Sequence, residues 1–186
     1  MFDEVILLVK IRIYGLGGQG VVTMGKVLCT AFSIYEHQYA KTMPAYGHER
    51  KGGAVLTDVI ADDERILTNS FITKPDYVIV LAPNAKAEEI KLDLSDSQNA
   101  VLLINTDEVR QEYAANFADC YFVDATAYSM AELGRNLPNI GMMAALVKTG
   151  VLSLEAVKNA VNDHFEKNAE AYNKVIMEAY NGTKRK

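Results

Sequence analysis

Short apolar runs alternate with amphipathic segments along about the first two thirds of the chain, and only amphipathic segments follow. The apolar runs have the length of strands, and the other segments have the spacing of helices with one buried face. We expect strands at residues 5–14, 38–42, 54–60, 77–81, 100–104 and 121–123. We expect helices at residues 21–35, 84–91, 107–117, 125–136 and 140–148, and two more between 153 and 180.

The order of these elements predicts the fold class. Strands that alternate with helices, followed by a helical C-terminus, indicate an α/β, three-layer Rossmann-like domain with a mixed, mostly parallel sheet. The sheet should be mixed because residues 54–60 and 66–67 flank a polar turn and predict a hairpin. Pro44 is expected to end the second strand. Ser153 is expected to cap the helix that begins directly after it. Residues 1–182 are expected to form a single domain and residues 183–186 a flexible tail.

Composition narrows the class of protein. The 186 residues carry a formal net charge of −5, and a mildly acidic chain without a basic stripe is a poor candidate for binding nucleic acid. The apolar stretch at residues 5–9 is too short for a membrane span or a signal peptide, so we expect no membrane contact and a cytoplasmic location. Cys29 and Cys120 are too few and too far apart to hold zinc or an iron–sulfur cluster, so no metal site is expected.

A glycine loop after the first strand is the most informative motif. Gly15, Gly17 and Gly20 have the spacing G-x-G-x-x-G, with Gly18 and Gln19 between them, and a helix can begin directly afterwards. In such a loop, backbone N–H groups can surround an anion at the positive end of the helix. The Gln19 amide can both donate and accept hydrogen bonds. The loop therefore predicts a phosphate-bearing ligand, and the alternative is that the glycines only allow the strand and helix to pack closely.

A dinucleotide is the first ligand that such a loop suggests. An NAD-binding fold also needs an acidic residue about 20 positions further on, at the end of the second strand, to hold the ribose. The chain has residues 41–44, Lys-Thr-Met-Pro, at that place, and Glu36 comes before the strand. An NAD(P)-dependent reductase and a stand-alone nucleotide-binding Rossmann-like module are therefore kept as alternatives.

A second motif, Tyr-Gly-His-Glu-Arg-Lys-Gly-Gly at residues 46–53, combines three glycines with charged residues. The glycines indicate unusual backbone angles or a close approach to another group. Arg50 could hold a carboxylate or phosphate through two N–H groups, or it could form a surface pair with Glu49. His48 could act as a general base, but no nucleophile or metal ligand lies at a suitable spacing. The sequence contains no complete catalytic set.

The two motifs together resemble the gamma subunit of 2-oxoacid:ferredoxin oxidoreductases, the group that includes the pyruvate and 2-ketoisovalerate enzymes. The likeness continues through residues 75–81 and more loosely through 139–142. The resemblance implies a subunit of a complex that oxidatively decarboxylates a 2-oxoacid, forms an acyl-CoA and passes electrons to ferredoxin or flavodoxin. It also implies that thiamine diphosphate, Mg²⁺ and [4Fe-4S] clusters belong to alpha, beta and delta-type partner subunits, and that this chain alone is inactive. An isolated subunit would expose an apolar patch and could form a homodimer through it.

The resemblance also assigns candidate binding residues. The Gly-Gly-Gln-Gly segment at residues 17–20 would meet the pyrophosphate of coenzyme A or a neighbouring subunit. Arg50 falls on the family's Glu-Arg-Arg-Gly-type segment, whose second basic residue is Lys51 here, which keeps the charge but loses the planar fork. We therefore expect no cofactor held by this chain alone and no catalytic residue. The expected coenzyme A contacts are Gly15, Gly17, Gly18, Gln19, Gly20 and Arg50.

Overall fold

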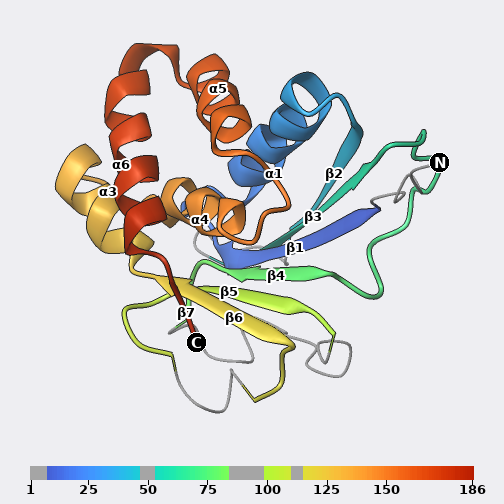
Figure 1. Cartoon of the computed structure of the whole chain (residues 1–186), viewed down its shortest axis with the longest axis horizontal. Coiled ribbons are helices and arrows are strands. Elements are labelled where there is room, and N and C mark those ends of the chain that lie inside the picture. The colour runs from blue at the N-terminus through green and yellow to red at the C-terminus, as the bar shows by residue number, and fades with distance from the viewer. Residues whose placement is uncertain (1–7, 47–52, 84–98, 110–114) are drawn as a thin grey trace, which may run out of the picture.

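The computed structural model describes residues 8–46, 53–83, 99–109 and 115–186. In these residues one sheet of seven strands has the order β2-β3-β1-β4-β5-β6-β7 (Figure 1). The strands are β1 (Val9–Leu16), β2 (Tyr39–Tyr46), β3 (Ala54–Asp62), β4 (Tyr77–Val80), β5 (Val101–Asn105), β6 (Asp119–Val123) and β7 (Lys184–Arg185).

The centre of the sheet is parallel. Strands β1, β4, β5 and β6 pair in parallel, whereas β3 runs antiparallel to both β1 and β2, and β7 runs antiparallel to β6. Among the described strands, all except β3 and β7 therefore point in the same direction. Side chains from both faces of the sheet are buried in two apolar clusters, as the continuous apolar runs of the central strands predict. The predicted mixed, mostly parallel α/β sheet is confirmed.

All the described helices cover one face of the sheet (Figure 1). They are α1 (Val21–Thr30), the π-helical turn η1 (Ala31–Tyr35), α3 (Ala125–Leu133), α4 (Pro138–Val147), α5 (Leu154–His164), the 3₁₀ turn η3 (Glu166–Asn168) and α6 (Ala169–Gly182). The helical C-terminus is confirmed, and Ser153 caps α5, its Oγ accepting from the Ala156 N–H at 3.1 Å. Every residue of α4 is buried, because this helix lies between the sheet and helices α1, α3 and α6.

The helices expected for the opposite face are not seen in the described residues. The segment 84–91 lies outside these residues. The segment 107–117 is described only at its ends, 107–109 and 115–117, which are bends and turns rather than helix. That face nevertheless carries its own buried apolar cluster, which includes Val78, Val80, Leu102 and Ile104.

Two predictions about β2 and β3 are wrong. Pro44 does not end the second strand but lies inside β2, at the edge of the described sheet, where a missing N–H is tolerated. The hairpin partner of β3 is β2 rather than residues 66–67. Because β1 and β2 already occupy both sides of β3, no edge is left for those residues, and Leu67 is 79% exposed.

The expected flexible tail at residues 183–186 is also wrong. Lys184 and Arg185 form β7, which pairs with Tyr121 and Phe122 of β6. Arg185 forms an ion pair with Asp119 at 2.8 Å, and the Lys186 N–H donates to the Cys120 carbonyl at 3.0 Å. The backbone of these residues pairs with the edge of β6. The sequence does not reveal this pairing, because the side chains involved are charged and exposed.

Candidate functional site

The glycine loop joins the parallel centre of the sheet to the helix layer. Strand β1 leads into it, and α1 begins at Val21 with Gly20 as its N-cap. Gly18 and Gly20 have φ angles of 98° and 79°, in the left-handed region that glycine adopts without steric cost. The predicted strand, loop and helix are therefore confirmed as structural elements.

The four glycines divide into two pairs. A Cβ at Gly15 would lie 2.6 Å from Val21 Cγ2 and 3.2 Å from Leu81 Cβ, so this glycine allows β1, β4 and α1 to pack closely. A Cβ at Gly20 would lie 2.5 Å from the Asn139 amide. Gly17 and Gly18 are exposed instead, and a Cβ at Gly18 would meet no atom within 4 Å. Gly15 and Gly20 thus serve packing, while Gly17 and Gly18 present backbone at the surface.

Gln19 closes the loop on itself. Its Oε1 accepts from the Leu16 N–H at 2.8 Å, and its own N–H donates to the Leu16 carbonyl at 3.1 Å. Its Nε2 makes no hydrogen bond to the described residues. One edge of the loop is further tied by the Gly17 N–H, which donates to the Gly53 carbonyl at 2.9 Å. The loop is therefore preformed, and no described residue engages the Gln19 Nε2 donor.

The start of α1 offers further donors. The first hydrogen bond inside the helix runs from the Met24 N–H to the Gly20 carbonyl at 2.8 Å, and no described side chain caps the helix. The N–H groups of Val21, Val22 and Thr23 therefore have no partner within α1, as at the beginning of any helix. These groups and the helix dipole favour a negative charge at this position.

A cleft of about 520 Å³ lies beside the loop, at the carboxyl ends of β1, β4 and β5 and the start of α3. In open α/β sheets, ligands bind at this edge. One part of its lining is apolar, namely Leu16, Leu81, Ala82 and Pro83. The polar part is made by Gln19, Asn105, Thr106, Asp107, Asp124, Thr126 and Asn136.

The far wall of the cleft is held by Asn105, which is only 6% exposed. Its Nδ2 donates to the Leu81 carbonyl at 2.8 Å and to Thr126 Oγ1 at 2.9 Å, and its Oδ1 accepts from the Thr126 N–H at 3.2 Å. One side chain thereby joins β5, the end of β4 and α3. This wall was not predicted from the sequence, although polar residues that directly follow buried parallel strands, such as Asn105 and Asp124, are the signal that could have located it.

The second motif is described only at its ends. Arg50, together with Lys51, His48 and Glu49, lies outside the described residues, so the contact expected for Arg50 stays a prediction. The hydrogen bond between Gly17 and Gly53 places the end of this motif beside the glycine loop.

Other reactive groups lie elsewhere. Burial raises the pKa of the Cys29 thiol to about 12, and burial is also the main cause that raises the pKa of Cys120 to about 11. Both thiols are therefore protonated and unreactive near neutral pH. Within the described residues, no group of three or more His, Cys, Asp or Glu side chains could hold a metal ion. None of the described helices is long and apolar enough to cross a membrane.

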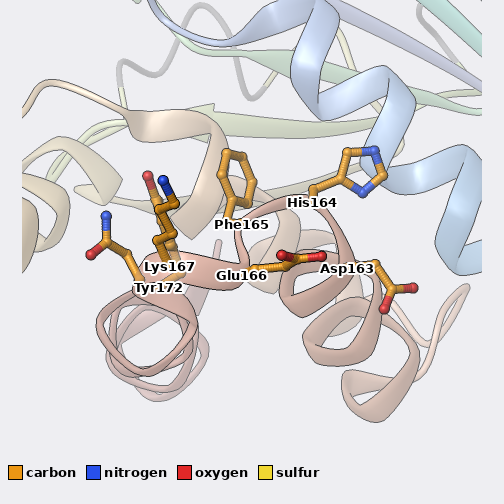
Figure 2. A pocket seen from close by; sticks show the side chains of 7 residues that line it. Asp163, His164, Phe165, Glu166, Lys167 and Tyr172 are labelled. Atoms are coloured by element: carbon orange, nitrogen blue, oxygen red, sulfur yellow. The ribbon is translucent and has the colours of Figure 1, made fainter.

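A second pocket of about 380 Å³ lies where α5 meets α6 and is shown in Figure 2. Two of its polar side chains, Asp163 and His164, are engaged by other groups of the chain. Asp163 accepts from the Tyr35 hydroxyl at 2.6 Å, and the His164 Nδ1 lies 3.0 Å from the Ala160 carbonyl. Phe165 and Tyr172 stack with their ring centres 4.4 Å apart. These side chains do not converge on a common point (Figure 2), so we do not treat this pocket as the functional site.

Comparison with known proteins decides the family. A family model described as pyruvate ferredoxin/flavodoxin oxidoreductase matches residues 10–182. The chain belongs to this family. It is 30% identical over 184 residues to the pyruvate/ketoisovalerate oxidoreductases common subunit gamma of Thermococcus kodakarensis, with 91% of this chain and 98% of that protein covered. It is 32% identical over 179 residues to the pyruvate synthase subunit PorC of Methanocaldococcus jannaschii, with the same coverage of 91% and 98%.

Solved structures agree with this family membership. The crystal structure of the pyruvate oxidoreductase subunit PORC from Thermotoga maritima has a TM-score of 0.77 at 26% identity, and the match covers 96% of this chain and 98% of that one. A 2-oxoglutarate:ferredoxin oxidoreductase from Magnetococcus marinus shares the fold, with a TM-score of 0.74 at 20% identity. That match covers 94% of this chain but 30% of the other, so the fold there is one part of a longer chain. The family resemblance carried by the two glycine motifs is confirmed.

Proposed function

We propose that this chain is the gamma subunit of a complex that carries out the coenzyme A-dependent oxidative decarboxylation of a 2-oxoacid and passes the electrons to ferredoxin or flavodoxin. The main support is the family match over residues 10–182. Relatives about 30% identical, named a common subunit gamma and a subunit PorC, also match over nearly their whole length. In this proposal the expected gamma-type domain of residues 1–182 acts in the cytoplasm and extends to β7, which pairs with β6. A stand-alone nucleotide-binding module and an NAD(P)-dependent reductase become the less favoured alternatives.

The chemistry is divided between the chains. Alpha, beta and delta-type partner subunits hold thiamine diphosphate, Mg²⁺ and the [4Fe-4S] clusters, and those groups supply the decarboxylation and the electron transfer. This chain contributes no catalytic residue. The raised pKa values of Cys29 and Cys120 support that division, because neither thiol is a thiolate nucleophile near neutral pH.

The role of this chain is to contact coenzyme A through the glycine loop. In the proposal, the pyrophosphate lies against the exposed backbone of Gly17 and Gly18 and the first N–H groups of α1. The Gln19 Nε2 supplies a further donor, while Gly15 and Gly20 give the loop its shape. The carboxylates of Asp107 and Asp124 in the cleft would repel phosphate, which favours the loop over the cleft for the charged part of the ligand.

Arg50 completes the proposed contact set. A guanidinium can bind phosphate oxygens through two N–H groups and would neutralise part of the pyrophosphate charge. The hydrogen bond from Gly17 to Gly53 supports this role, since it brings the end of the second motif to the loop. The competing possibility is that the same residues contact a neighbouring subunit instead.

The Gln19→Ala variant tests this function in the complex purified through a tag on this chain. We expect the KM for coenzyme A to rise roughly tenfold or more, while kcat stays unchanged. The variant removes the Nε2 donor, whose hydrogen bond to a charged group is worth about 1.5 kcal/mol, and also the Oε1 bond to the Leu16 N–H that closes the loop. Gln38→Ala is the matched control, because that amide binds Asp63 at 2.8 Å on the surface. An unchanged KM would mean that the loop has only a structural role. Loss of the partner subunits from the purified complex would mean that the loop contacts a neighbouring subunit.

A further inference from the structure

Asn139 is a buried amide that faces the glycine loop from a different part of the chain. It is 2% exposed and lies in the first turn of α4. With the amide orientation that satisfies its neighbours, its nitrogen donates to the Gln19 carbonyl at 3.2 Å and to the Leu137 carbonyl at 3.3 Å. The side chain therefore links the start of α4 to the peptide that precedes α1.

The lack of a side chain at Gly20 leaves room for the Asn139 amide. A Cβ at position 20 would lie 2.5 Å from the Asn139 Cγ, and 2.5 Å and 2.7 Å from the two terminal atoms of its amide. No side chain at position 20 could coexist with Asn139 in this place. The φ angle of 79° at Gly20 adds a second requirement for glycine, and both requirements are met by the same residue.

Holding the Gln19 carbonyl also fixes the next N–H group. The described residues contain no cis peptide bond, and in a trans peptide the carbonyl oxygen and the following N–H point in opposite directions. The Gln19 carbonyl points to Asn139, so the Gly20 N–H points away from it. Without that bond, the peptide between Gln19 and Gly20 could rotate more freely, because Gly20 restricts the φ angle on one side of it little.

Helix α4 is a firm base for such a contact. All its residues are buried, and Gly141 lets it approach its neighbours so closely that a Cβ there would lie 2.7 Å from the Ala125 Cβ and 3.2 Å from the Ala179 Cβ. A side chain anchored on this helix moves little relative to the sheet. Asn139 therefore holds the loop in a fixed position relative to the buried helix α4.

We infer that Asn139 is a positioning residue for the binding loop: it holds the peptide between Gln19 and Gly20 so that the Gly20 N–H faces the ligand side. This inference rests on the proposed role of the loop in binding coenzyme A. Asn139 touches no ligand itself and acts through the backbone of the loop.

The test uses Asn139→Leu, which keeps the shape of the side chain and removes the donor, with Asn139→Ala as a second variant. Both are introduced into the purified complex. Hydrogen–deuterium exchange of the segment 17–23 should increase, and the KM for coenzyme A should rise roughly fivefold or more, with kcat and the KM for the 2-oxoacid unchanged. The control is Asn173→Ala on α6, which removes an amide bond to Asn162 of 2.7 Å and should change neither quantity.

The two readouts separate the inference from the function on which it rests. Unchanged exchange in segment 17–23 for both variants would overturn the positioning role directly. If exchange increases while the KM for coenzyme A stays constant, and Gln19→Ala still raises that KM, the inference is overturned as well. If Gln19→Ala also leaves the KM unchanged, the proposed coenzyme A role fails, and the exchange data alone then decide whether Asn139 holds the loop.

Discussion

Two of the loop glycines, Gly18 and Gly20, have left-handed backbone angles but different surroundings. A side chain at Gly18 would enter open space, whereas a side chain at Gly20 would collide with the Asn139 amide. The strain of a positive φ is shared by both positions, but the steric conflict is not. Glycine is therefore required at position 18 for its backbone conformation alone. At position 20 it is required both for its backbone conformation and for packing against Asn139.

This difference predicts unequal costs for two matched substitutions. Gly18→Ala should lower the free energy of unfolding by about 1–3 kcal/mol, the usual cost of a residue held in an unfavourable backbone region. Gly20→Ala should lower it by more, because it adds the collision with a buried side chain. Urea unfolding of the purified chain measures both values, and equal losses would contradict the packing role of Gly20.

The two thiols also make a prediction at the residue scale. Their pKa values of about 12 for Cys29 and about 11 for Cys120 lie above that of a free thiol, near 9, mainly because burial disfavours the thiolate. Since the folded pKa values are raised, the protein should keep its full stability below about pH 9 and lose part of it as the pH rises through 11 and 12. Iodoacetamide at about pH 8 should label both thiols in the unfolded chain and neither in the native chain. Rapid native labelling of Cys29, which is partly buried, would contradict its raised pKa.

At the scale of elements, the sequence located most strands and helices because their apolar periodicity is strong. The central strands and the helices of the C-terminal half follow directly from it. The errors occur where partners far apart in sequence decide the outcome. Pro44 is accommodated because β2 is at the edge of the sheet, and residues 184–185 become a strand because β6 has a free edge.

A buried ion pair is a second feature that local sequence patterns do not predict. Asp58 on β3 is fully buried and pairs with Arg12 on β1 at 2.8 Å, and its hydrogen bond raises the pKa of Arg12. The same carboxylate accepts from the Ile72 N–H at 2.7 Å, and Arg12 donates to the Ile72 carbonyl. These bonds hold the segment after β3 against the sheet. No local pattern could predict them, because the three residues are separated by 14 to 60 positions.

At the scale of the whole molecule, the sequence predicted the family and the loop but not the complete site. The spacing of Gly15, Gly17 and Gly20 is a local signal, and the loop followed from it. The cleft wall around Asn105 and the buried support from Asn139 arise only when separate βα units come together. The contact expected for Arg50 remains a prediction.

In the proposed complex, this chain supports coenzyme A-dependent chemistry that the partner subunits carry out. The direct measurement is 2-oxoacid-dependent dye reduction by the partner subunits, by this chain alone and by both together, as a function of coenzyme A concentration. We predict no turnover by this chain alone and saturable, coenzyme A-dependent turnover only when it is combined with its partners. Turnover by the isolated chain, or full coenzyme A-dependent turnover by the partners without it, would contradict the account.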